Sequence, residues 1–121
     1  MDKRAVNMIA KKQQELCESK DAWEKSLDKI VSLAQQGVSS ELVDELRSFA
    51  RIDEKRERLK TTIYRGELSM TEEYQGITEE SCAKAMIDGN ETEAIKEFYR
   101  RNTHKVNHCI DKIRQMERGI E

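Results

Sequence analysis

The residues best suited to metal chemistry are two histidines and a cysteine near the C-terminal end of the sequence. His104 and His108 stand four residues apart, and Cys109 follows directly. Residues four apart share a helix face, so two imidazoles there can approach one metal ion. The intervening residues lack the glutamate of the H-E-x-x-H motif, and a third ligand would have to come from another helix. We therefore predict surface histidines and no metal site.

Adjacent carboxylates are the other groups with potential chemistry. They occur at Glu72-Glu73 and Glu79-Glu80. Adjacent helical residues do not face each other, and negative charge in a first helical turn is favoured by the helix dipole, so capping accounts for both pairs. The sequence also has no glycine-rich phosphate loop and no catalytic Ser-His-Asp or Cys-His spacing. We expect no enzyme, no catalytic residue and no cofactor.

Basic clusters raise the question of nucleic-acid binding. They occur at Lys11-Lys12, at residues 56–60 and at Arg100-Arg101. Acidic residues at helical spacing accompany each cluster, and such pairs stabilise a helix surface by roughly 0.2–0.5 kcal/mol each. The 22 basic and 24 acidic residues give a net charge of −2, unlike the basic footprint of a duplex-binding protein. A nucleic-acid-associated regulatory protein is therefore the alternative function and not the leading one.

Composition favours long helices with wide solvated faces. Charged residues make up 38% of the 121 residues, against about 25% in an ordinary domain. Proline is absent and the apolar residues recur periodically, which favours helices over disorder. The sequence predicts an all-α fold, a long antiparallel helical hairpin within a coiled-coil-like bundle of three to four helices. We expect a single domain over residues 1–121.

Four helices are expected in this domain, at residues 4–36, 41–64, 78–88 and 91–118. In the first of them Trp23 and Leu27 occupy two positions of a heptad stripe that polar residues interrupt. Between the first two helices, Gly37 is suited to a left-handed stop and Ser39 or Ser40 to an N-cap. A connection this short predicts antiparallel neighbours.

The cleanest heptad pattern lies in the expected helix 91–118. We name its apolar stripe, with one polar member, the C-terminal seam: Ile95, Tyr99, Asn102, Val106, Cys109, Ile113 and Met116. A lone polar residue in such a stripe fixes register at some cost in stability. We expect the Asn102 amide to pair with its own copy across a two-fold axis, or with Gln13 or Lys20. Replacing it with leucine is then expected to raise the melting temperature.

Narrow apolar stripes on a highly charged chain predict function by association. The leading hypothesis is a non-enzymatic protein–protein interaction module, a small adaptor, chaperone or regulator. Its partner is another protein, a second copy of the chain, or both, with a dimer expected. The cysteines Cys17, Cys82 and Cys109 are odd in number and widely spaced, which fits a cytoplasmic location. No run approaches the roughly 20 apolar residues of a membrane helix, so no membrane partner is expected.

Overall fold

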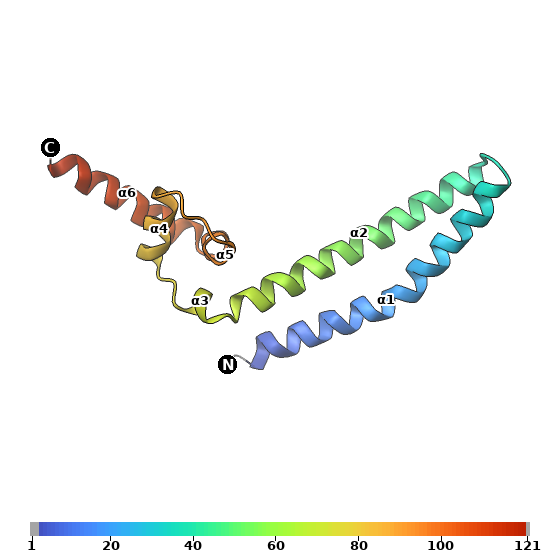
Figure 1. Ribbon diagram of the computed structural model, residues 1–121, viewed down its shortest axis with the longest axis horizontal. Coiled ribbons are helices and arrows are strands. Elements are labelled where there is room, and N and C mark those ends of the chain that lie inside the picture. Colours follow the sequence, from blue (N-terminus) through green and yellow to red (C-terminus); the bar gives the residue numbers. More distant parts are fainter. Residues whose placement is uncertain (1–2, 121) are drawn as a thin grey trace. The chain divides into compact units, whose positions relative to one another are not determined.

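The computed structural model describes residues 3–120, which are mostly helical with no strand among them, so the all-α prediction is confirmed. The helices are α1 (Lys3–Gln35), α2 (Ser40–Ser69), α3 (Glu72–Gln75), α4 (Glu79–Ile87), α5 (Glu93–Arg101) and α6 (Thr103–Ile120) (Figure 1). None of these helices is both long and apolar enough to cross a membrane. The chain divides into two compact units, Met1–Tyr64 and Arg65–Glu121. The expectation of a single domain stays a prediction.

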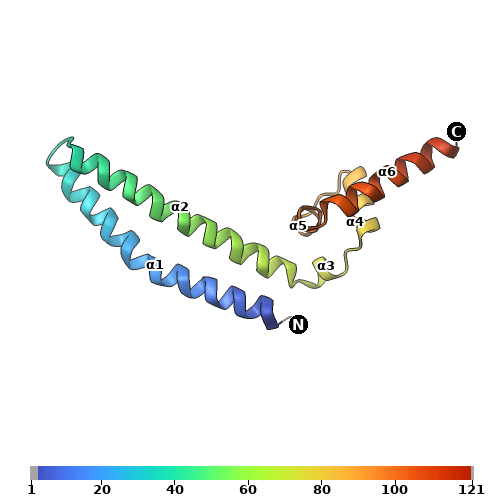
Figure 2. The ribbon, with the colours of Figure 1, turned by 180° about the vertical axis from the view of Figure 1, so that it is seen from behind.

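The first unit is an antiparallel hairpin of α1 and most of α2, which lie side by side in both views (Figures 1 and 2). The turn depends on Gly37, whose φ of 94° is in the left-handed region that side chains with a Cβ rarely adopt. Beyond it, the Leu42 N–H donates to the Ser39 hydroxyl at 3.1 Å, so Ser39 caps α2. The glycine stop and serine cap lie where the sequence places them.

Polar and aromatic groups join the two helices where the heptad stripe is interrupted. The indole N–H of Trp23 donates to a carboxylate oxygen of Asp53 at 3.0 Å, and its ring lies 5.6 Å from the Phe49 ring. The Arg56 guanidinium is 5.7 Å from the Trp23 ring centroid and donates to the Ser19 hydroxyl at 2.7 Å. A cation over an indole face is an attractive arrangement. The middle of the hairpin is therefore held by directional contacts as much as by apolar burial.

A second polar contact lies nearer the turn. The buried Ser26 hydroxyl donates to Glu45 Oε1 at 2.7 Å, and Lys29 Nζ lies 3.4 Å from Glu45 Oε2. The hydrogen bond from Ser26 lowers the pKa of Glu45, desolvation opposes that change, and Lys29 lowers the pKa further. Residues later in α1 thus meet residues earlier in α2, which fixes the antiparallel register.

The second unit folds around a small core from α4, α5 and α6. Cys82, Ala83 and Val106 have no exposed surface, and Ile95 is 9% exposed. Small residues on α4 let α6 pack closely against it. Partly buried side chains surround this core: Ile77, Ala85, Met86, Phe98, Tyr99, Cys109, Ile110 and Ile113. The core is sufficient to order short helices but covers only part of α6.

A buried carboxylate holds the end of α2 against α5. Glu97 is 4% exposed, and the guanidinium of Arg100 donates to both its oxygens, at 2.8 and 3.0 Å. Arg65 Nε lies 3.8 Å from Glu97 Oε1 and Arg101 Nε lies 3.4 Å from Oε2. A carboxylate removed from water needs such charge-assisted hydrogen bonds to offset its desolvation. In the sequence this residue looks like one more exposed acid beside a basic cluster.

The same cluster reaches α3 through aromatic rings. The Arg101 guanidinium lies 5.8 Å from the Tyr74 ring centroid, and the Tyr74 and Phe98 rings are 5.8 Å apart. The second helix must therefore extend far enough for Arg65 to reach this cluster. It continues through the buried Gly66 to Ser69, so the predicted end at residue 64 is wrong.

The predicted continuous helix over residues 91–118 is also wrong, because the chain breaks at Asn102 into α5 and α6. The backbone of Asn102 leaves the helical region at φ −129° and ψ 34°. Its amide Nδ2 donates to the Phe98 carbonyl at 3.0 Å, and its own carbonyl accepts from the Val106 N–H, which begins α6. In Figure 1, α5 is viewed nearly end-on whereas α6 lies across the page.

The physical reason for the break is the core. Ile95 and Val106 are both buried in one cluster, yet a straight helix would hold residues eleven apart about 16 Å from each other along its axis. The Tyr99 hydroxyl likewise donates to Asn107 Oδ1 at 2.9 Å, across eight residues that a straight helix would spread over about 12 Å. Bending at Asn102 is what lets both ends of this segment contact the same core.

The break reverses the expected effect of replacing Asn102. We predict that Asn102→Leu lowers the free energy of unfolding by about 1 kcal/mol, because it removes the hydrogen bond to Phe98 and favours a straight helix. Chemical denaturation followed by circular dichroism measures the change. A matched control is Asn7→Leu at an exposed position inside α1, where leucine's higher helix propensity leaves stability unchanged or slightly raised. A more stable Asn102→Leu variant would contradict the break and support the continuous helix that the sequence predicts.

The buried carboxylate gives a second prediction. We expect Glu97→Ala to lower the free energy of unfolding by roughly 1.5–3 kcal/mol, the range for hydrogen bonds to charged groups. The control is Glu93→Ala, which removes an exposed partner 3.6 Å from Lys96 and should cost less than about 1 kcal/mol. Equal losses for the two variants in denaturant titrations would show that Glu97 is no more important than a surface acid.

Candidate interaction surfaces

The structure divides the C-terminal seam between the core and the surface. Val106 and Ile95 are buried, Tyr99, Cys109 and Ile113 are partly buried, and Met116 is 70% exposed. Asn102 is partly buried at the helix break, where its amide donates to a carbonyl of its own helix, and its pairing with Gln13, Lys20 or a second Asn102 stays a prediction. Burial along α6 therefore falls from its first turns toward its C-terminal end.

Unequal helix lengths cause this decline. The nine residues of α4 span about 13 Å, whereas the 18 residues of α6 span about 27 Å. Side chains from residue 114 to residue 119 are all exposed. The periodic apolar pattern continues to Met116, so the seam reaches the part of α6 that α4 covers least.

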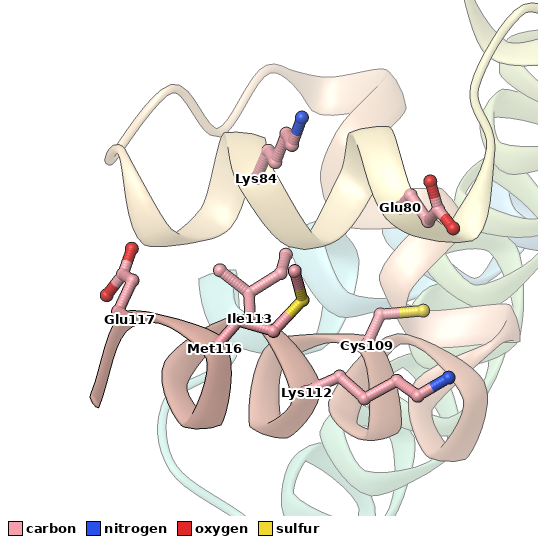
Figure 3. A pocket seen from close by; sticks show the side chains of 7 residues that line it. All are labelled: Glu80, Lys84, Cys109, Lys112, Ile113, Met116 and Glu117. Carbon is pink, nitrogen blue, oxygen red and sulfur yellow. The ribbon is translucent and has the colours of Figure 1, made fainter. Parts of the chain in front are cut away.

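An open cavity of about 510 Å³ lies between α4 and α6 (Figure 3). The side chains of Ile113 and Met116 point from α6 toward α4 in this view. Its apolar lining comes from α6 and its charged lining from both helices: Cys109, Ile113, Met116, Glu80, Lys84, Lys112 and Glu117. We call this cavity and its lining the α4–α6 groove. Its two lysines and two glutamates give the rim no net charge.

A second apolar surface lies on the hairpin, and the heptad stripe of the sequence predicts only part of it. Trp23 is partly buried between the helices, but Leu27 is 37% exposed. Three further apolar residues near the turn are exposed at least as much as Leu27: Val31 at 52%, Val43 at 38% and Leu46 at 46%. We name Leu27, Val31, Val43 and Leu46 the hairpin strip.

Helical geometry places the hairpin strip on one side of the hairpin. Leu27 and Val31 directly follow the inward-facing Ser26 and Ile30, and Val43 and Leu46 directly follow Leu42 and Glu45. One residue further along a helix turns the side chain by about 100°. Because the helices run antiparallel, that step turns toward the same side of the hairpin in both. The sequence contains the hairpin strip as two pairs of apolar residues, each one position after an inward-facing residue. Only the register of the hairpin shows that the two pairs lie on the same side.

The groups considered for chemistry are not brought together. His104 and His108 are exposed, and within residues 3–120 no three His, Cys, Asp or Glu side chains cluster as metal ligands would. Burial, and to a lesser degree the charge of Glu91, raises the pKa of the Cys82 thiol, which disfavours the reactive thiolate. Cys17, Cys82 and Cys109 are free. The expected absence of a metal, a cofactor and a catalytic residue stays a prediction.

Comparison with known proteins adds no relative. No protein-family model, curated protein or solved structure matches the chain. The α4–α6 groove and the hairpin strip are therefore the features that bear on function.

Proposed function

We propose that the chain is a non-enzymatic protein–protein interaction module, a small helical adaptor, chaperone or regulator, that binds a helix of a partner protein in the α4–α6 groove. One observation carries this proposal. The C-terminal seam continues along α6 to where α4 covers it least, which leaves Met116 70% exposed beside the half-covered Cys109 and Ile113.

The lining suits an amphipathic helix. Cys109, Ile113 and Met116 follow each other at four and three residues, the spacing of one helix face, and α4 forms the opposite wall. A third helix can insert its own apolar stripe between two such walls. Methionine is flexible and polarizable, so Met116 adapts to side chains of several shapes. The groove is thus better suited to a family of related helices than to one rigid small molecule.

The charges around the groove favour a protein partner over a nucleic acid. Lys84 and Lys112 are balanced by Glu80 and Glu117. A phosphate backbone would meet the glutamates as well as the lysines, whereas a helix with both acidic and basic residues beside its apolar stripe can pair with each. The nucleic-acid alternative remains a prediction that the same experiment tests.

Free cysteines bear on where the module works. Cys17 is exposed and Cys109 lines the groove, so an oxidising compartment would expose both thiols to cross-linking. We therefore propose a reducing, cytoplasmic setting. The absence of catalytic machinery is part of the same proposal, since no histidine lines the groove to activate the Cys109 thiol.

Substitution of Met116 tests the proposal. We expect Met116→Glu to weaken partner binding at least about tenfold, because burying a methionine side chain contributes roughly 1.5–3 kcal/mol and a buried carboxylate would oppose it. The measurement is quantitative affinity capture from the native cell with the full chain as bait, followed by titration of the retained protein.

The matched control is Gln115→Glu, which adds the same charge at the neighbouring exposed residue outside the groove. A protein that is retained by the unaltered chain and by the control, that persists in high salt and that is lost from the Met116 variant supports the proposal. Identical retention by all three baits contradicts it. Loss of the captured material on nuclease treatment would favour the nucleic-acid alternative instead.

A further inference from the structure

The two sides of the hairpin differ in chemistry. One side carries the hairpin strip, whose four side chains are 37–52% exposed. The other side carries the ion pair of Lys29 with Glu45 and exposed polar residues such as Ser32 and Ser48. Isolated apolar residues on a surface are ordinary, but four grouped on one side of a helical pair near its turn are typical of a docking face. The hairpin strip shares no residue with the α4–α6 groove, so a role for it is independent of the function proposed for the groove.

The register of the hairpin places residues of the two helices at matching levels. Ser19 meets Arg56, Trp23 meets Phe49 and Ser26 meets Glu45. Continuing that register along the strip side puts four residues of α1 level with four of α2: Val31 with Val43, Leu27 with Leu46, Trp23 with Ala50 and Lys20 with Asp53. The strip side therefore has an apolar part near the turn and a charged level beyond it.

We propose that the hairpin strip binds the strip of a second copy of the chain, with the two-fold axis parallel to the helices, so that two hairpins form an antiparallel four-helix bundle. In this arrangement α1 of one copy lies over α2 of the other and both turns point the same way. Each residue then faces the residue that shares its level on the other helix. Leu27 packs over the partner's Leu46, and Val31 packs over the partner's Val43.

Size complementarity supports a second copy as the occupant. Among the residues of the strip side that lie at matching levels, the largest is Trp23 on α1. The residue level with it on α2 is Ala50, which is exposed and small. A two-fold arrangement places the indole over that alanine twice. The other two-fold arrangement, with its axis across the helices, would set α1 over α1 and α2 over α2, so Trp23 would not face Ala50.

Charge complementarity supports the same occupant and the same orientation. Lys20 is 67% exposed and its ion pair with Glu24 on the same helix is long, at 3.8 Å, so a carboxylate of a second chain can compete for its ammonium. Asp53 is only partly buried and uses one oxygen for the Trp23 indole. Facing copies bring Lys20 of each chain over Asp53 of the other, which gives two symmetric ion pairs at the edge of an apolar centre. A chain that complements itself in both size and charge does not require a different protein on this face.

Sedimentation of the full chain in the micromolar range tests the proposal. The expected species is a dimer of twice the 14.1 kDa chain mass, and Leu46→Glu is expected to raise its dissociation constant more than 100-fold because the substitution enters the interface twice. The matched control is Ser48→Glu on the polar side of the same helix, which should leave the dissociation constant within about twofold. Circular dichroism shows whether each variant keeps its helices.

A charge exchange tests the orientation without removing apolar contacts. Lys20→Glu places like charges together and is expected to weaken the dimer severalfold, and adding Asp53→Asn in the same chain is expected to restore it. Asparagine keeps an oxygen for the Trp23 indole, so the hairpin itself retains its hydrogen bond. Cross-linking gives an independent readout in a background with Cys17→Ser and Cys109→Ser. Chains carrying Val31→Cys should form disulfides with chains carrying Val43→Cys far more than with themselves.

Each outcome decides the question. A dimer that Leu46→Glu dissociates and that shows the mixed disulfide supports the proposal. A monomer throughout the micromolar range overturns it, as does a dimer that Leu46→Glu leaves intact. A dimer that dissociates with Met116→Glu instead would place self-association in the α4–α6 groove. Loss of partner capture by Met116→Glu with the dimer unchanged would show that the two surfaces are separate.

Discussion

The change of chain direction at Asn102 is the constraint on which the second unit depends. A straight helix would place its buried apolar residues too far apart to share one core, so the segment must bend for Ile95 and Val106 to be covered together. Asparagine suits the bend because its side-chain amide gives the Phe98 carbonyl a second donor beside the Asn102 backbone N–H, which holds the last turn of α5 closed. The same bend sets which residues of α6 face α4 and which extend past it.

A low apolar content and exposed apolar surfaces have a common explanation. Directional contacts supply part of what a larger apolar core would supply, through Trp23 and Arg56 in the hairpin and through the arginines around Glu97 in the second unit. Some of the apolar residues that these small cores do not bury are grouped, in the hairpin strip and along the α4–α6 groove. Such grouping is what an interaction module needs, since scattered apolar residues would give no partner a continuous surface.

Sequence periodicity predicted the all-α fold and placed the hairpin turn, because Gly37 and Ser39 act through local backbone chemistry. It failed at Asn102, where a heptad pattern typical of a continuous helix competes with the need to close a small core. The burial of Glu97 gave no signal, since its spacing to Arg100 and Arg101 is that of an ordinary surface pair and Arg65 becomes a neighbour only through the tertiary fold. Met116 lines the groove with its seam neighbours Cys109 and Ile113, but its exposure depends on how closely α4 approaches, which periodicity within one helix does not encode.

Nuclear Overhauser contacts within the second unit measure directly whether the bend divides the C-terminal seam between core and surface. We expect contacts from both Ile95 and Val106 to Cys82, a contact between the Tyr99 ring and the Asn107 side chain, and loss of helical chemical shifts at Asn102. We also expect no contact from the Met116 methyl group to the core. Unbroken helical shifts from residue 93 to residue 118, with no contact linking Tyr99 to Asn107, would contradict the bend and the division of the seam that depends on it.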